Sequence, residues 1–156
     1  MQLVTSAKTS RNQLPAGAKK IEWQKATVNF DYGSGKYEKM TEYLKEQGVY
    51  NIKYDPFNLS KKENQDALDY AKENYIDSLT CFNVLNVIAD KESREKVISH
   101  CYEVLNNTGM AYFQMYEGDK TGTGKKTRDG FQNNMRARNY FPEIREIFKN
   151  RRFIIL

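Results

Sequence analysis

One stretch near the amino end limits the folds open to this chain more than any other. Residues 28–37, VNFDYGSGKY, combine an apolar strand, an acid at Asp31, two glycines and the start of a helix. Gly33 and Gly35 allow a tight turn in which the backbone comes close to a ligand, and the first turn of the following helix offers unpaired N–H groups. The stretch therefore predicts a ligand-binding loop between a strand and a helix.

A second acid stands at the end of the next strand. Asp55 follows the strand 49–54 and lies twenty residues after Gly35, with an amphipathic helix ending near Gly48 between the two strands. A strand, a helix and a strand of these lengths form a parallel, right-handed unit. In such units an acid at the tip of the second strand holds the ribose hydroxyls of a nucleotide.

The rest of the chain continues the alternation of strands and helices. Ser60 and Glu63 form a capping-box pattern at the start of one helix, and Asp90 is the expected cap of another. The predicted elements are strands at 26–30, 49–54, the first half of 76–88, 110–116 and 153–156, and helices at 37–48, 61–74, 91–106, 127–139 and 142–149. About five strands alternate with helices, which predicts an α/β fold with an open, mostly parallel sheet.

Length and composition favour one globular domain. The chain has 156 residues, including 8 Phe and 11 Tyr, which is enough to bury a single core. We expect residues 1–156 to form one domain with a polar amino-terminal arm at 1–17. No apolar run approaches the roughly 20 residues that span a bilayer, and the amino-terminal residues lack the apolar centre of a signal peptide. We therefore expect no membrane contact and a cytoplasmic location.

Cysteine and histidine are too few for a metal centre. The chain contains two cysteines, Cys81 and Cys101, and one histidine, His100. A structural zinc site needs about four closely spaced ligands. We therefore expect no metal, two buried thiols and a histidine on a helix surface.

The residues around the glycines discriminate between classes of ligand. The third glycine of a dinucleotide-binding turn would fall at position 38, which is Glu38, and this carboxylate would face a pyrophosphate. Residues 33–36 also lack the spacing and the Ser or Thr of a phosphate-binding Walker loop. An acid ahead of the glycines instead suits a ligand that carries an ammonium and a sulfonium group. The pattern favours S-adenosyl-L-methionine (SAM), and NAD stays as an alternative because of the spacing of Asp55.

Three short motifs resemble a known family. DYGSGK at 31–36, YDPF at 54–57 and TCFNVLNVI at 80–88 are similar to motifs of class I SAM-dependent methyltransferases. The nearest group is a set of small bacterial and phage proteins that includes methyltransferases associated with DNA phosphorothioation. The resemblance covers residues 25–116 and implies a reduced Rossmann-like three-layer sandwich. The chain has room for neither the usual third strand nor the full carboxy-terminal hairpin of that family.

The resemblance also implies roles for single residues. Asp31 would steer the ammonium group of SAM, and Asp55 would hold its ribose. Residues 56–57 would flank the adenine, and residues 82–83 would line the methionine side. The full set of predicted cofactor-binding residues is Asp31, Tyr32, Gly33, Gly35, Asp55, Pro56, Phe57, Phe82 and Asn83.

The carboxy-terminal third is basic and predicts a polyanionic partner. Residues 120–152 contain ten Lys and Arg and three acidic residues, a net charge of +7, whereas the whole chain carries +5. Nucleic acid is the first candidate partner, and a basic surface that only aids solubility is the alternative. The loop and helix at 117–141 would form the substrate side. The predicted substrate contacts are Tyr116, Glu117, Gln132, Asn133 and Tyr140.

These observations lead to a SAM-dependent methyltransferase whose acceptor the sequence does not identify. No catalytic residue is predicted, since a sulfonium is already a good leaving group and alignment supplies much of the rate. The alternative is a SAM-binding, methyltransferase-like protein without transfer activity, acting as a partner subunit or an anti-defence factor. The sheet edge left open by the missing third strand would suit a homo-oligomer.

Overall fold

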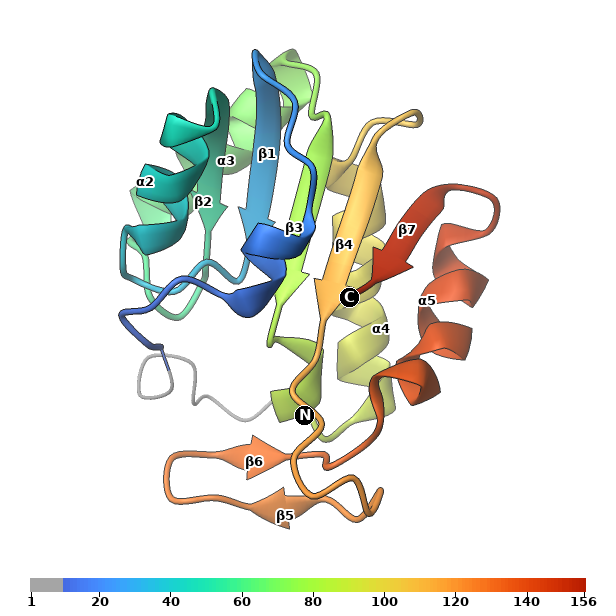
Figure 1. Ribbon diagram of the computed structural model, residues 1–156. Coiled ribbons are helices and arrows are strands. Elements are labelled where there is room, and N and C mark those ends of the chain that lie inside the picture. Colours follow the sequence, from blue (N-terminus) through green and yellow to red (C-terminus); the bar gives the residue numbers. More distant parts are fainter. Residues whose placement is uncertain (1–9) are drawn as a thin grey trace.

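A parallel sheet forms the centre of the chain. The structure is a computed structural model that describes residues 10–156, so the first nine residues of the predicted arm at 1–17 lie outside the described residues. The strands follow the order β2-β1-β3-β4-β7, and each neighbouring pair is parallel (Figure 1). They are β1 (Thr27–Tyr32), β2 (Val49–Tyr54), β3 (Ser78–Phe82), β4 (Met110–Gln114) and β7 (Arg152–Ile155).

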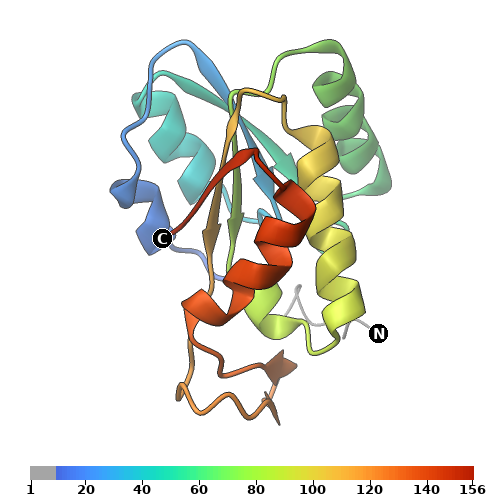
Figure 2. The same cartoon turned by 90° about the vertical axis from the view of Figure 1, so that its right-hand side faces the viewer.

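Helices cover both faces of this sheet. One face carries η1 and α2, and the other carries α3, α4 and α5 (Figure 1, Figure 2). The helical elements are η1 (Ala16–Lys20), α2 (Lys39–Glu46), α3 (Lys61–Glu73), η2 (Leu85–Val87), α4 (Lys91–Val104), η3 (Ala137–Tyr140) and α5 (Phe141–Phe148). The predicted α/β fold of reduced Rossmann-like type is confirmed. As predicted, α3 alone connects β2 to β3, and β7 pairs in parallel with β4 rather than within a hairpin.

Local sequence patterns explain where the helices begin. Ser60 and Glu63 exchange side-chain to backbone hydrogen bonds, both at 3.1 Å, so the predicted capping box at the start of α3 is confirmed. Asp90 Oδ2 accepts from Ser93 N at 3.1 Å and caps α4, also as predicted. α2 begins at Lys39, two residues later than predicted.

Apolar side chains on the two faces form two clusters. The larger lies between the sheet and α3, α4 and α5, and includes the fully buried Phe30, Leu79 and Phe113. The smaller lies under η1 and α2 and includes Leu44 and Phe82. Burial of side chains of this size stabilises the fold by about 1.5–3 kcal/mol each. Among residues 10–156, every helix is too short or too polar to cross a bilayer.

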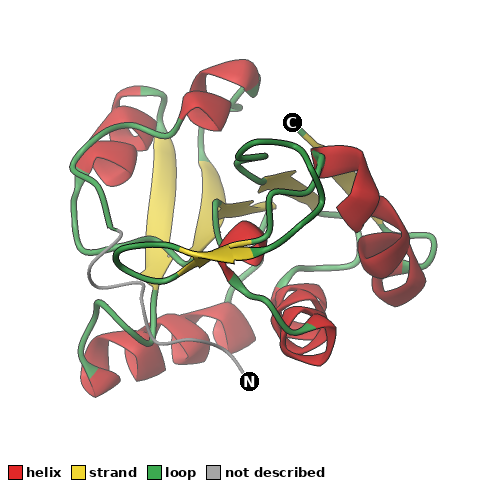
Figure 3. Cartoon of the chain, turned by 90° about the horizontal axis from the view of Figure 1, so that it is seen from below, coloured by secondary structure: helices red, strands yellow, loops and turns green. Residues whose placement is uncertain are grey.

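The segment predicted as a helix at 127–139 is a hairpin instead, and that prediction is wrong. The hairpin strands β5 (Lys125–Lys126) and β6 (Phe131–Gln132) pair antiparallel. The hairpin lies beyond the carboxyl ends of the main strands and across them in the end view (Figure 1, Figure 3). Asn134 has a φ of 57°, and its side chain bonds to two backbone groups of the preceding loop. Asparagine side chains that compete for backbone groups in this way disfavour a helix interior.

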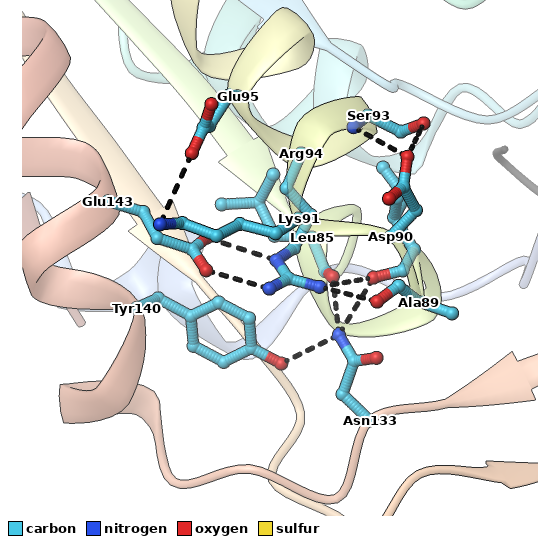
Figure 4. Close-up of polar contacts among 11 residues, drawn as sticks. Leu85, Ala89, Asp90, Lys91, Ser93, Arg94, Glu95, Asn133, Tyr140 and Glu143 are labelled. Carbon is cyan, nitrogen blue, oxygen red and sulfur yellow. Dashed lines mark hydrogen bonds and ion pairs between the residues drawn. The ribbon is translucent and has the colours of Figure 1, made fainter.

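A buried ion pair joins α4 to α5. The Arg94 guanidinium donates to both carboxylate oxygens of Glu143, at 2.7 and 3.0 Å, and both side chains are less than a tenth exposed (Figure 4). It also donates to the carbonyls of Ile88 and Ala89, each at 2.9 Å. Asn133 reaches the same place from the hairpin and donates to the Ile88 carbonyl at 3.0 Å. The cluster therefore ties α4, α5 and the hairpin together.

Removing one partner of this ion pair leaves the other charge buried. We expect Glu143→Ala to lower the free energy of unfolding by about 3–5 kcal/mol, because Arg94 then keeps an uncompensated charge. Urea denaturation followed by circular dichroism measures the change. Glu146→Ala, at an exposed position of the same helix, is the control and is expected to stay within about 0.5 kcal/mol of the parent. Equal effects of the two substitutions would contradict a stabilising role for the ion pair.

Candidate ligand-binding site

A cavity of about 1060 Å³ opens at the carboxyl ends of the strands. Its walls come from the residues that follow β1, β2, β3 and β4, and from parts of the amino-terminal segment and the hairpin. In open parallel sheets a ligand binds at this edge, where the strand order reverses, and here the reversal falls between β1 and β3. All nine residues predicted to bind a cofactor line this cavity: Asp31, Tyr32, Gly33, Gly35, Asp55, Pro56, Phe57, Phe82 and Asn83.

The glycine turn has the conformation that its sequence predicts. Gly33 and Gly35 have φ values of 77° and 70°, a region that strains residues with a Cβ. A Cβ at Gly33 would also overlap the side chain of Val84, which follows β3. The Gly33 N–H donates to the carbonyl of Tyr54 at 2.8 Å. The turn is thus held between the ends of β2 and β3.

The carboxylate of Asp55 organises the loops beside this turn. It accepts hydrogen bonds from Gly35 N at 2.8 Å, Phe57 N at 2.9 Å and Asn58 Nδ2 at 2.8 Å. Asp55 is buried, yet it lines the cavity. A carboxylate has roughly four acceptor sites, so these three contacts leave room for one donor from a ligand. Its predicted contact with a ribose stays a prediction.

A ladder of buried polar side chains crosses the sheet and ends at Asp31. Ser78 Oγ donates to Asn29 Oδ1 at 2.8 Å. Asn29 Nδ2 donates to Asn51 Oδ1 at 2.9 Å and to Thr80 Oγ1 at 3.0 Å. Thr80 Oγ1 then donates to Asp31 Oδ1 at 3.0 Å. Buried polar groups cost free energy unless they are bonded, so the ladder both tolerates the Asp31 carboxylate and orients it.

Sequence reasoning did not identify this ladder. A pattern that points to it is present, because Asn29 and Asn51 stand inside strands that are otherwise rich in apolar and aromatic residues. An amide at such a position needs a partner on a neighbouring strand. The identity of that partner depends on the strand order, which single-sequence patterns do not supply.

Burial changes the acid strength of Asp31. The side chain is 6% exposed, and loss of solvent raises the pKa of its carboxyl from 3.8 to about 6. The hydrogen bond from Thr80 and the charge of Lys53 lower the pKa and offset part of this effect. A cation placed in the cavity beside Asp31 would lower the pKa of this carboxyl toward its ordinary value. The site is therefore suited to a positively charged group.

Tyr32 and His100 form a contact on the other face of the sheet. Tyr32 Oη and His100 Nδ1 lie 2.7 Å apart and share a hydrogen bond, and both rings pack against Tyr54. His100 lies on a helix, as predicted, but it is only partly exposed, because α4 presents it to the end of β1. Burial lowers the pKa of His100. Cys81 and Cys101 are free and buried, as predicted.

Three buried amide oxygens of the cavity-lining residues have no hydrogen-bond partner. They are Asn58 Oδ1, Asn86 Oδ1 and Gln114 Oε1, and they are the only such side-chain atoms found among residues 10–156. Folded proteins leave few buried polar groups unsatisfied, and a bound ligand or water is a common explanation. Sequence reasoning did not select these residues as ligand contacts. These three oxygens are themselves buried, and Gln114 Oε1 lies against Gly17 of η1.

The residues predicted for the substrate side divide into two groups. Tyr116, Glu117 and Gln132 line the cavity, and Tyr116 is 64% exposed. Asn133 and Tyr140 do not line it: they are 5% and 0% exposed and bond to each other at 3.2 Å. These two side chains support the hairpin from inside, because a buried phenol needs a hydrogen-bond partner and Asn133 provides it.

The buried carboxylate gives stability a defined pH dependence. Because the pKa of Asp31 is about 6 in the folded chain and 3.8 ordinarily, the folded state holds the proton more tightly, and stability falls as the pH rises through this range. We expect Asp31→Asn to exceed the parent in stability by about 2–3 kcal/mol near pH 7.5 and to lose this advantage near pH 4. Urea denaturation at both pH values measures the difference.

Asp69→Asn provides the matched control for this experiment. Asp69 is exposed on α3, so the same change of chemistry there should leave the pH dependence of the parent intact. If Asp31→Asn kept the parent's pH dependence as well, the Asp31 carboxyl would not be the group that titrates.

Metal-binding groups and likeness to known proteins are two further points that bear on the site. The described part of the chain contains no group of three or more His, Cys, Asp or Glu side chains placed to hold a metal ion. Comparison with models of known protein families gives no match for this chain, and comparison with curated proteins gives none either. The arrangement of the cavity therefore carries the functional argument.

Proposed function

We propose that the cavity binds SAM and that the chain is a methyltransferase. The observation that carries this proposal is the buried carboxylate of Asp31, which lies in the cavity wall at the end of β1. A carboxylate with little solvent gains much from a cationic partner, since the attraction is weakly screened there. SAM has two positive groups, its ammonium and its sulfonium.

The polar groups around the cavity suit SAM better than a dinucleotide. The ammonium, the ribose hydroxyls and the adenine amine of SAM can each donate a hydrogen bond. The cavity offers the carboxylates of Asp31 and Asp55 as acceptors to them. A pyrophosphate held at the glycine turn would instead meet the carboxylates of Asp31 and Asp55. The NAD alternative is disfavoured for this reason.

The lining residues can be assigned to parts of SAM. Asp31 would take the ammonium group, and Asp55 would take a ribose hydroxyl with its remaining acceptor site. Residues 56–57 would flank the adenine, and residues 82–83 would line the methionine side. When bound, SAM supplies an activated methyl group. The chain's own residues would hold the donor, exclude water around it and align the acceptor.

A second candidate function is SAM binding without methyl transfer. The acidic residue among the predicted substrate contacts is Glu117, and its carboxylate already accepts a hydrogen bond from Ala137 N at 2.7 Å. Cys81 is fully buried in β3, so its thiol is not available as a nucleophile. A chain of this kind would act as a partner subunit or an anti-defence factor. The basic carboxy-terminal third makes nucleic acid the first partner to test in either case.

Calorimetry with three ligands tests the cofactor. We expect the chain to bind SAM and S-adenosylhomocysteine and not NAD. Asp31→Asn should weaken SAM binding by about 1.5–3 kcal/mol, because a hydrogen bond between charged groups is lost. Asp69→Asn on α3 should leave the affinity unchanged. Binding of NAD but not of SAM would overturn the proposal.

The affinity for SAM should depend on pH through Asp31. The carboxyl must be ionised to meet the ammonium, and the pKa of Asp31 is about 6 before a ligand is present. We expect the affinity to fall by up to about tenfold for each pH unit below this value. Titrations near pH 5 and pH 7.5 measure the change, and Asp31→Asn should abolish it. A parent affinity that is the same at both pH values would remove Asp31 from the ligand contacts.

Transfer of a labelled methyl group separates the two candidate functions. We expect the chain to label one of three pools, DNA, RNA or protein, when it is supplied with methyl-labelled SAM. The reason is that an aligned acceptor and a sulfonium need little further assistance. Scintillation counting of the separated pools measures the product, and Asp31→Asn should reduce it. SAM affinity without any labelled product would favour the binding protein.

A further inference from the structure

Five basic side chains on and beside the hairpin form a patch that we call the cationic rim. It consists of Lys120, Lys126, Arg128, Arg136 and Arg138, and all five side chains are exposed. None of them has a carboxylate partner within residues 10–156, whereas the neighbouring Lys125 lies 3.6 Å from Asp119. Of the acids nearby, Glu117 accepts a hydrogen bond from the backbone N–H of Ala137 in η3. The rim therefore carries a net positive charge that the fold does not neutralise.

The segment that carries the cationic rim borders the cavity. The hairpin is placed beyond the carboxyl ends of the main strands in both side views (Figure 1, Figure 2). Lys120 and Arg128 line the cavity themselves, although Asp129 lies between Arg128 and the next strand. Lys20 and Lys39 line it from η1 and α2. The cavity therefore combines carboxylates at the strand ends with cations from the surrounding elements, and the two sets suit different parts of a ligand.

The rim is attached to the core by asparagine side chains. Asn134 Oδ1 accepts from Asp119 N at 3.2 Å, and its Nδ2 donates to the carbonyl of Thr123 at 3.0 Å. The next residue toward β6, Asn133, donates to the carbonyl of Leu85 in η2 and to that of Ile88 just after it (Figure 4). Gly118 packs so closely on Asn134 that a Cβ would overlap it. These contacts hold the backbone that carries the basic residues in a defined position relative to the cavity.

An exposed aromatic ring lines the cavity close in sequence to the rim. Tyr116 follows β4, lines the cavity and is 64% exposed, the highest exposure among the large hydrophobic residues of the described chain. Its ring has no aromatic partner among residues 10–156. An exposed ring beside a row of cations is the combination that binds single strands, in which bases stack on aromatics and phosphates meet Lys and Arg.

We propose that the cationic rim and Tyr116 bind an unpaired strand of nucleic acid and that the methyl acceptor is one of its nucleotides. The rim would hold the phosphates on both sides of the acceptor, and Tyr116 would stack on a base at the cavity mouth. A base inside a duplex does not reach a cavity of this kind without leaving its stack, which favours an unpaired strand. The assignment of the acceptor rests on the proposed methyltransferase function. The binding surface does not.

Fluorescence anisotropy with the full chain tests the surface. The probes are a labelled DNA strand of about 16 nucleotides, the RNA of the same sequence, the DNA duplex and a labelled oligoglutamate peptide. We expect one or both strands to bind at least about tenfold more tightly than the duplex and the peptide at low salt. Raising the salt from about 50 to 200 mM should weaken strand binding, because phosphate contacts release counterions.

Two variants separate the phosphate contacts from the stacking contact. Lys126→Ala/Arg128→Ala should weaken strand binding by about tenfold or more and reduce the salt slope by roughly 1–2. Tyr116→Ala should weaken it by about 5- to 100-fold with little change of slope. Lys45→Ala/Lys72→Ala removes the same charge from exposed positions at the far ends of α2 and α3, and should leave binding nearly unchanged. Circular dichroism of each variant checks that it is folded.

The outcomes distinguish this proposal from the proposed function. Equal losses in the rim and control variants would overturn the surface, and so would duplex or oligoglutamate binding as tight as strand binding. Calorimetric binding of SAM without strand binding would overturn the rim and leave the methyltransferase proposal standing. Strand binding that the variants weaken as predicted, without any SAM binding, would overturn the methyltransferase proposal and leave the rim standing. If the strand contains the acceptor, we expect it to become labelled with radioactive methyl. Lys126→Ala/Arg128→Ala should abolish this labelling.

Discussion

The chemistry at the end of this sheet depends on a carboxylate that the fold buries. Asp31 lies on β1, between β2 and β3, and Thr80 replaces part of the hydrogen bonding that water would supply. The compensation is incomplete, because burial still raises the pKa of Asp31 to about 6. Apolar packing at the same place would often be equally or more stable. The ladder that ends at Asp31 is therefore better explained by the cavity beside it than by the stability of the fold.

Parallel pairing brings the rest of the site to this carboxylate. Asp31 is opposite Lys53 and Tyr32 is opposite Tyr54 in the register of β1 and β2, so the loops after both strands begin at the same level. Asp55 then accepts the N–H of Gly35, and two loops that lie twenty residues apart become one wall. In the usual doubly wound order a third strand would lie beyond β2, on the side away from β3. The reduced sheet can therefore lack that strand and still keep the cavity.

The distance between bonded residues along the chain explains which features the sequence predicts. The capping box at Ser60 depends on a neighbour three residues away, and the glycine turn and β2 have clear signals within their own short stretches, so these predictions are confirmed. The hairpin depends on Asn133, which bonds to Leu85 from 48 positions away. The ladder depends on Asn29, whose partners are 22 and 51 positions away. Periodicity and motif spacing contain no information about such pairs, so the helix predicted at 127–139 was wrong and the ladder was missed.

The hairpin and the cavity share one short helix. Asn133 N donates to the carbonyl of Asn86 at 2.9 Å, and its side chain donates to the carbonyl of Leu85 at 2.9 Å, so the hairpin is attached to η2. Asn86 also carries one of the unpaired amide oxygens among the cavity-lining residues. Contacts to one three-residue turn therefore hold the hairpin beside the cavity.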